Sequence, residues 1–449
     1  MPLPGATGTL DPATGPGYAP ASMNPSTGEP RLLSGPAGRA LAILTAINLL
    51  NYLDRFVVSA LFESLRADLW LTDARLGSLG TVFIIVYGLA SPLFGIAGDR
   101  RPRPPLLALG VGLWSLAAML SGAARGYWTL LAARAAVGIG EAAYGTISPG
   151  LLADHFGPSR RSRAYAVFFA AIPVGVALGY IVGGLVDRRL GWRWAFLISG
   201  VPGLVLALSC LRLRDPPRGA SESTWVIRGE GGIAATYRRL LSNRPYALAV
   251  LGYAAYTFAV GGMAFWMPAF LERTRGVPRS VATVQFGAIV VMTGFAGTFA
   301  GGYLADALRR RFREADLWLC GITTLAAAPL ALVVFMTYRP ILYLVALVLA
   351  QLLLFASTGP VNAAIVNAVA PAERASAVAI SILAIHLLGD VPSPWLIGII
   401  SDRSSLGRAV LIVPAAILVS GIIWTWAAWR GERAARAARN GDQARSAAS

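Results

Sequence analysis

Four charged residues lie inside stretches of the sequence that are otherwise apolar: Asp54 and Arg55 in one stretch, Arg134 and Glu141 in another. A charged side chain at mid-membrane costs about 2.5–3.5 kcal/mol even on the mildest insertion scale, so each of them needs a partner or a water-filled cavity. The spacing of seven residues places Arg134 and Glu141 on about one face of a helix, two turns apart. We therefore predict that a solvent-accessible cleft at mid-membrane receives all four charges.

Such a cluster can act as a protonation switch. Burial favours a neutral Glu141 carboxyl group and a nearby Arg134 favours a charged one, so opening or closing the cleft changes the balance. A proton taken up on one side and released on the other would couple a gradient to a conformational cycle. Arg134 or Arg55 could instead hold an anionic head group. The remaining alternative is a static ion-pair network that only fixes helix packing.

The second half of the chain has fewer charges in its apolar stretches. His386 and Asp390 are four residues apart and can share a helix face. The histidine could relay protons, or the two residues could form a hydrogen-bonded pair at a helix end. Other side chains are candidates for the opposing wall of a cavity, with packing or interface roles as the alternative. These candidates are Tyr253, Tyr256, Trp266, Asn362 and Asn367.

A Gly-x-x-x-Asp pattern followed by arginine occurs four times, ending at Asp99, Asp187, Asp306 and Asp402. Glycine lets neighbouring backbones approach closely. The aspartate can then pair with the positive N-terminal end of an adjacent helix and with flanking arginines. We predict a gating latch at the first copy and treat the third as a candidate for the same role, whereas Asp187 and Asp402 are expected to be solvated helix ends. The predicted gating residues are Gly95, Asp99, Arg100, Arg103, Gly302 and Asp306.

The elements that position these residues are apolar helices. The 449 residues are 56% hydrophobic and 14% charged, whereas soluble domains have about 25% charged residues. Apolar runs long enough to cross about 30 Å of hydrocarbon recur along the chain, and helices satisfy their backbone polar groups in lipid. The predicted spans are 40–62, 75–97, 104–124, 127–153, 164–186, 192–211, 245–271, 281–305, 316–337, 340–369, 375–400 and 408–429.

The positions of the repeat indicate how these helices are organised. Gly-x-x-x-Asp closes the second, fifth, eighth and eleventh predicted helices, a period of three helices that inverts at each step. We therefore predict an all-α membrane protein of twelve transmembrane helices, in two six-helix halves built from inverted three-helix repeats. The predicted parts are a disordered cytoplasmic tail at 1–37, bundles at 38–211 and 244–430, a cytoplasmic linker at 212–243 and a basic cytoplasmic tail at 431–449.

The charge of the chain indicates orientation in a membrane. All 39 basic residues are arginine, and they are roughly twice as frequent in segments on the side of the termini as on the opposite side. We predict a multi-pass protein of the inner (plasma) membrane with both termini in the cytoplasm. The net charge of +17 then reflects topology and contact with membrane lipids, and we expect no nucleic-acid partner.

Two motifs resemble signatures of the major facilitator superfamily. The stretch from Gly95 to Arg103 resembles the superfamily's loop between helices 2 and 3, and Arg134 with Gly138 and Gly140 resembles its helix-4 motif. This resemblance implies transport by alternating access, with helices 1 and 4 lining a central cavity. It also implies that helix 11 is the neighbour of the Asp99 latch.

A narrower resemblance is to the spinster family, and it extends over nearly the whole chain outside the tails and the linker. It is carried by Asn51-Tyr-Leu-Asp54-Arg55, by Glu141-Ala142 after the helix-4 motif, and by Phe265-Trp-Met-Pro268. Members of that family carry lysophospholipids and sphingoid phosphates, some with proton coupling. The resemblance thus implies proton-coupled export or translocation of a lipid-like amphipath by a chain that we expect to be monomeric.

Other functions remain to be weighed against this one. A proton symporter of a small organic anion and an uncoupled uniporter are the alternatives among transporters. An enzyme is not expected, because two distant histidines and the distant Cys210 and Cys320 form no set with metal-ligand spacing. The sequence also has no Gly-x-Ser-x-Gly elbow and no phosphate-binding loop. We expect no cofactor and no metal.

Overall fold

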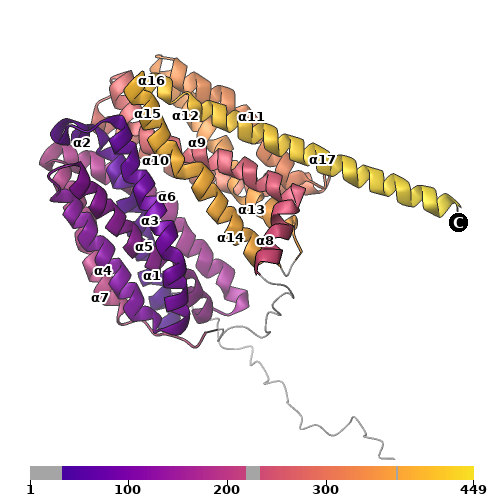
Figure 1. Cartoon of the computed structure of the whole chain (residues 1–449), viewed down its shortest axis with the longest axis horizontal. Helices are drawn as coiled ribbons and strands as arrows, with labels where there is room; N and C mark the ends of the chain where they lie inside the picture. The colour runs from indigo at the N-terminus through magenta and orange to yellow at the C-terminus, as the bar shows by residue number, and fades with distance from the viewer. Residues whose placement is uncertain (1–32, 219–232, 371–372, 449) are drawn as a thin grey trace, which may run out of the picture.

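The computed structural model describes residues 33–218, 233–370 and 373–448, and almost all of them are helical (Figure 1). The predicted tail at 1–37 and linker at 212–243 therefore fall partly outside the described residues. The first part of the chain contains α1 (Gly35–Ala60), α2 (Phe62–Leu69), α3 (Asp73–Arg100), α4 (Arg103–Gly122), α5 (Tyr127–His155), α6 (Pro158–Leu190) and α7 (Trp192–Cys210).

The second part begins with α8 (Ile233–Ser242), which lies within the predicted linker. It continues with α9 (Arg244–Arg275), α10 (Arg279–Arg309), α11 (Ala315–Met336), α12 (Pro340–Ala356), α13 (Thr358–Asn367), α14 (Arg374–Ile385), the π-helix η2 (His386–Asp390), α15 (Pro392–Arg403), α16 (Leu406–Ala409) and α17 (Ile412–Ala448). The predicted helix at 375–400 is regular throughout, so the π-helical turn at η2 is not predicted from the sequence. Pro392 and Pro394 follow it and lack the amide hydrogens that a regular helix would use there.

Eleven helices in the described part of the chain are long and apolar enough to cross a membrane. The 29-residue α5 is not among these eleven, and it carries Arg134 and Glu141. The sequence motif on α5 has a packing role. A Cβ atom on Gly138 would lie 2.6 Å from the Phe83 carbonyl oxygen of α3, and one on Gly140 would lie 2.6 Å from the Gly110 carbonyl oxygen of α4. Glycine at these two positions lets α5 pack closely between its neighbours.

The two parts of the chain form two helical bundles that lie side by side (Figure 1). Helix α10 packs against α6 across the boundary between them, and α15 packs against α3. Among the described residues, the hydrogen bonds between the bundles lie toward one end, where α3 and α10 begin and α6 and α15 finish. We call this the latch end. The opposite end, where α1 begins and α8 lies, is the linker end.

Candidate functional site

The four predicted charges come together in the first bundle. Helix α1 brings Asp54 and Arg55, and α5 brings Arg134 and Glu141. The Arg55 Nη2 atom donates to Glu141 Oε2 at 2.8 Å. The hydrogen-bonded partner of Glu141 is therefore an arginine from another helix, 86 positions away in the sequence, and not Arg134 on its own helix.

Both guanidinium groups of this cluster lie close to the aromatic ring of Phe83. The Arg55 guanidinium carbon lies 4.9 Å from the ring centroids of both Tyr52 and Phe83, and that of Arg134 lies 5.3 Å from the Phe83 ring. Two cations thus share one aromatic ring, an arrangement that stabilises them with little hydrogen bonding. The ring of Phe83 belongs to α3, which α5 approaches closely through Gly138.

The structure corrects the expectation that a cleft exposes all four charges. The Arg55 side chain is 20% exposed, whereas Asp54, Arg134 and Glu141 are buried in this conformation. Both Asp54 carboxylate oxygens, all three Arg134 side-chain nitrogens and Glu141 Oε1 have no hydrogen-bond partner among the described residues. Ser199 and Trp114 are polar neighbours of Asp54 but lie outside hydrogen-bond geometry. Burying charged or polar groups without hydrogen bonds costs folding free energy unless a proton or a polar ligand compensates them.

An apolar cavity of about 530 Å³ lies between the two bundles. Tyr52 and Phe56 of α1 and a stretch of α6 line it from the first bundle, and residues of α9, α10, α12 and α13 line it from the second. Phe169 and Phe299 belong to this lining and are 48% and 66% exposed, so the cavity wall continues onto the outer surface of the helices. Tyr52 joins the cavity to the charge cluster, because its ring also contacts the Arg55 guanidinium.

The predicted opposing wall is only partly assembled around this cavity. Tyr256 lines it, and its hydroxyl donates to the Leu354 carbonyl oxygen at 2.9 Å. Tyr253 lies within reach of Asn362, whose side-chain amide donates to the Thr358 carbonyl oxygen at 2.8 Å. Of the predicted residues in the second bundle, only Tyr256 belongs to the lining.

The other residues predicted for the second bundle lie away from this cavity. His386 and Asp390 form a hydrogen-bonded pair at 3.0 Å within η2, both partly exposed. Asn367 is exposed at the end of α13. Trp266 is fully buried, and its Nε1 atom donates to the Pro394 carbonyl oxygen at 2.9 Å within the second bundle. Its ring lies 5.1 Å from that of Phe62 in the first bundle. Trp266 thus packs at the interface and does not face the cavity.

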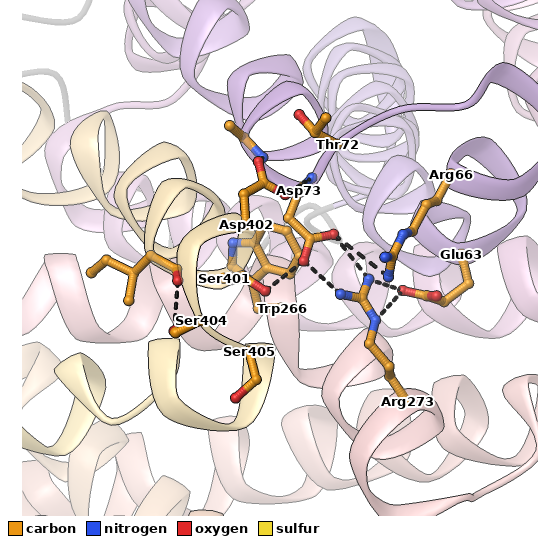
Figure 2. Close-up of polar contacts among 12 residues, drawn as sticks. Glu63, Arg66, Thr72, Asp73, Trp266, Arg273, Ser401, Asp402, Ser404 and Ser405 are labelled. Carbon is orange, nitrogen blue, oxygen red and sulfur yellow. Dashed lines mark hydrogen bonds and ion pairs between the residues drawn. The ribbon is translucent and has the colours of Figure 1, made fainter.

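A charged network joins the two bundles at the latch end (Figure 2). Arg273 of α9 donates to Glu63 of α2 at 3.2 Å and to Asp73 of α3 at 2.5 Å. Ser401 of α15 donates to the same Asp73 carboxylate at 2.5 Å. Each of these contacts joins one bundle to the other. We call Glu63, Asp73, Arg273, Ser401 and the adjacent Asp402 the first latch.

Asp402 shows how the repeated motif operates. Its two carboxylate oxygens accept hydrogen bonds from the backbone N–H groups of Asp73 and Ala74 at 2.8 and 2.9 Å, at the N-terminus of α3. Gly398, one turn earlier, has no Cβ atom and lets α15 contact the Asp73 backbone. A carboxylate at a helix N-terminus satisfies free N–H groups and the helix dipole. The expectation of a merely solvated helix end at Asp402 is wrong.

A second latch lies at Asp187, which ends the corresponding motif on α6 and accepts from side chains instead of backbone N–H groups. Its carboxylate accepts from Arg279 at the start of α10 at 2.7 Å and from Ser64 of α2 at 2.6 Å. Arg279 also pairs with Glu272 at 2.9 Å. Asp187 is therefore engaged across the bundles, and the expectation of a solvated end is wrong here too. A signal for both latches is present in the sequence, since the repeat marks all four helix ends equally.

The predicted gating residues lie at the linker end, and no contact with the second bundle is described for those in the first. Arg100 is exposed, and Arg103 is buried in ion pairs within the first bundle. A Cβ atom on Gly95 would lie 3.5 Å from Thr146 of α5, whereas one on Gly302 would meet nothing within 4 Å. Asp306 pairs with Arg309 on its own helix. Asp99 lies in the last turn of α3.

The family model described as Major Facilitator Superfamily matches residues 44–389. Spinster homolog 3 of Danio rerio is 36% identical over 384 residues, which cover 82% of this chain and 77% of that protein. The chain belongs to the spinster family of the major facilitator superfamily. It is thus a multi-pass membrane protein of a transporter family whose members are not enzymes.

Other relatives agree with this assignment to the spinster family. A sphingosine-1-phosphate transporter of Xenopus tropicalis is 33% identical over 415 residues, covering 86% of this chain and 80% of that protein. Among solved structures, a bacterial homolog of the human lysosomal transporter spinster, in an inward-facing and unoccupied conformation, has a TM-score of 0.80 at 24% identity. The alignment covers 88% of this chain and 98% of that one. This spinster-family chain therefore has the fold of that protein.

Proposed function

We propose that this chain is a secondary active transporter that moves a lipid-like amphipath, of the lysophospholipid or sphingoid type, by proton-coupled alternating access. The observation that carries the proposal is the junction between the apolar cavity and the charge cluster. Tyr52 lines the cavity and contacts Arg55, and Arg55 pairs with Glu141 at 2.8 Å. An apolar tail in the cavity would place an anionic head group beside Arg55.

The cavity is suited to the tail of such a substrate. Its walls are almost wholly aromatic and aliphatic, with Gln351 and two threonines among the few polar side chains. Each CH₂ group of an acyl chain removed from water contributes about 0.8 kcal/mol. The exposed Phe169 and Phe299 carry the same apolar surface toward the lipid, so a chain could pass between cavity and bilayer without crossing a polar barrier.

The charge cluster supplies the head-group site and the coupling. While Glu141 is ionised it holds Arg55, and a proton on Glu141 removes that attraction and frees the guanidinium for an anionic head group. Proton binding and head-group binding are then linked by one coupling free energy, which acts equally in both directions. Arg134 and Asp54 extend the site, because Asp54 lies within electrostatic range of Arg134 and Glu141.

Alternating access follows if the latch end and the linker end open and close in turn. The excess of arginine on the side of the termini supports placing the linker end in the cytoplasm and the latch end outside. The conformation described here then opens toward the cytoplasm. We further propose that α5 is a twelfth membrane span, whose two charges are tolerated because they face α1 and α3. The Gly-x-x-x-Asp copies on α3, α6, α10 and α15 support inverted repeats.

Filling the cavity tests this function directly. Gly294 of α10 lines the cavity, and a Cβ atom there would meet its first neighbour at 3.6 Å, so Gly294→Leu places a side chain in the cavity without a backbone clash. Leucine also favours a helix over glycine by up to about 1 kcal/mol, which protects folding. We expect flux of a fluorescent lysophospholipid in proteoliposomes to fall at least about tenfold, a change of about 1.4 kcal/mol.

The matched control is Gly150→Leu on α5, where a Cβ atom would meet open space. It should transport like the unchanged protein. Normal lipid flux in a folded Gly294→Leu protein would remove the cavity from the substrate path. Flux of hydrophilic organic acids, with no competition by single-chain lipids, would favour the organic-anion symporter. Saturable lipid flux that ignores an imposed pH gradient would favour a uniporter.

A further inference from the structure

The first residues of the segment that joins the bundles fold back onto the first bundle. Residues 215–218, which we call the clasp, follow α7. The Asp215 carboxylate accepts from the Arg103 backbone N–H at 2.9 Å and from Arg103 Nε at 2.6 Å. Arg103 is the first residue of α4. Asp215 therefore places a negative charge on the N-terminus of α4, where free N–H groups and the helix dipole favour it.

Arg218 places a positive charge on the C-terminus of α3, the helix that precedes α4. Its Nη2 atom donates to the carbonyl oxygens of Gly98 at 2.7 Å and Arg101 at 2.6 Å. Gly98 lies in the last turn of α3, and Arg101 caps that helix. A cation at this position satisfies carbonyl groups that lack partners within the helix and complements the negative end of its dipole.

Arg103 ties the clasp to a third helix. It is 5% exposed, its Nη1 atom donates to Asp154 in the last turn of α5 at 2.6 Å, and its Nη2 atom donates to the Pro216 carbonyl oxygen at 2.6 Å. The pair Pro216-Pro217 has fixed φ angles, so little conformational freedom remains between the two charged ends of the clasp. The linker ends of α3, α4 and α5 are thereby joined into one unit.

The other end of the connecting segment is anchored in a similar way. Arg239 of α8 pairs with Glu373, the N-cap residue of α14, at 2.9 Å. The side chain of Asn243, which follows α8, donates to the carbonyl oxygen of Ala368, which caps α13, at 2.8 Å. One connector is therefore attached to the loop between α3 and α4 in the first bundle and to the ends of α13 and α14 in the second.

We propose that the clasp is a positioning device that holds the α3–α4 loop, with Asp99 and Arg100, in the orientation needed to close the linker end against the second bundle. Arg101 and Pro102 join α3 to α4, and the clasp binds this short loop at both of its ends. In the clasp, Asp215 accepts from a backbone N–H group at the start of α4, and Arg218 donates to a carbonyl group at the end of α3. The inference rests on alternating access as proposed above, and Asp215 and Arg218 act through the loop without touching the substrate.

Two single variants test the clasp: Asp215→Asn and Arg218→Gln. In proteoliposomes of phosphatidylcholine and phosphatidylglycerol, each should lower the maximal flux of a fluorescent lysophospholipid by roughly tenfold, the effect of lost charged hydrogen bonds. The concentration for half-maximal flux should stay unchanged, because the binding site is intact. Amide hydrogen exchange at residues 98–101 and at Arg103 should become faster, since Asp215 protects the Arg103 N–H and prolines occupy positions 102, 104 and 105. Arg218→Lys should recover part of the flux.

The matched control is Arg212→Gln, an exposed arginine six residues before Arg218 for which no side-chain contact is described. It should leave flux and exchange unchanged. Unaltered maximal flux in a folded Arg218→Gln protein, or an equal loss in Arg212→Gln, would overturn the proposal. If the unchanged protein carries no lipid, the proposed function fails. The exchange measurement still judges the clasp in that case, and unaltered exchange in both variants would refute it.

Discussion

Replacing Glu141 by glutamine is expected to reduce pH-gradient-driven flux by about 5- to 150-fold, the range of coupling free energies of 1–3 kcal/mol. Glutamine keeps the size of the side chain and can still accept one hydrogen bond from Arg55, so the fold should persist. It cannot gain or lose a proton. Arg55 would then remain available to an anionic head group at every pH, and the link between proton and substrate would be broken.

The measurement is uptake of a fluorescent lysophospholipid into proteoliposomes, with and without an imposed pH gradient. Downhill flux without a gradient should survive in the Glu141→Gln protein, whereas the stimulation by the gradient should disappear. Glu314→Gln is a suitable control, because Glu314 caps α11 outside the membrane-spanning segments. Burial raises the pKa of Glu314, so the control also removes a titrating carboxyl group, but away from the cluster. Full stimulation in Glu141→Gln would exclude this residue from coupling.

The charge cluster shows what the sequence can predict and where prediction stops. The cost of a charge in lipid identifies Asp54, Arg55, Arg134 and Glu141 one residue at a time. It does not identify partners. Arg55 pairs with Glu141 because α1 and α5 bring together positions that are 86 residues apart, and Phe83, which covers both arginines, has no sequence signal beyond being apolar. Burial of three of the four charges likewise depends on packing between helices.

The latches show a different limit. The repeat marks four equivalent helix ends, and the geometry predicted for Asp99, a carboxylate on the N-terminus of a neighbouring helix, is found at Asp402. A sequence encodes every conformation of an alternating-access protein, so it cannot show which end is closed in a given one. The residues that complete the network, such as Arg273 and Asp73, lie outside the repeat, and charged residues near helix ends are too common to single out.

The second large effect is expected at Arg273. In the structure this side chain joins α9 to Glu63 and Asp73 of the other bundle (Figure 2). Hydrogen bonds to charged groups contribute about 1.5–3 kcal/mol each when they are not fully solvated. Arg273→Gln should therefore destabilise the closed latch end and raise the population open at that end by about 10- to 100-fold, since each 1.4 kcal/mol is a factor of ten.

Ser59 offers a reporter for that opening. It is buried in the seam, where its hydroxyl donates to the Ala264 carbonyl oxygen of the other bundle at 3.1 Å, and both native cysteines are buried. A membrane-impermeant thiol reagent applied outside should react with the thiol introduced at this position about 10- to 100-fold faster in the Ser59→Cys/Arg273→Gln protein than in Ser59→Cys alone. The acceleration should be proportional to the increase in the open population. The control is Arg275→Gln, because Arg275 binds the Phe335 carbonyl oxygen at 2.6 Å within its own bundle. Equal acceleration in both variants would indicate general loosening, and no acceleration in Arg273→Gln would mean that the first latch does not hold this end closed.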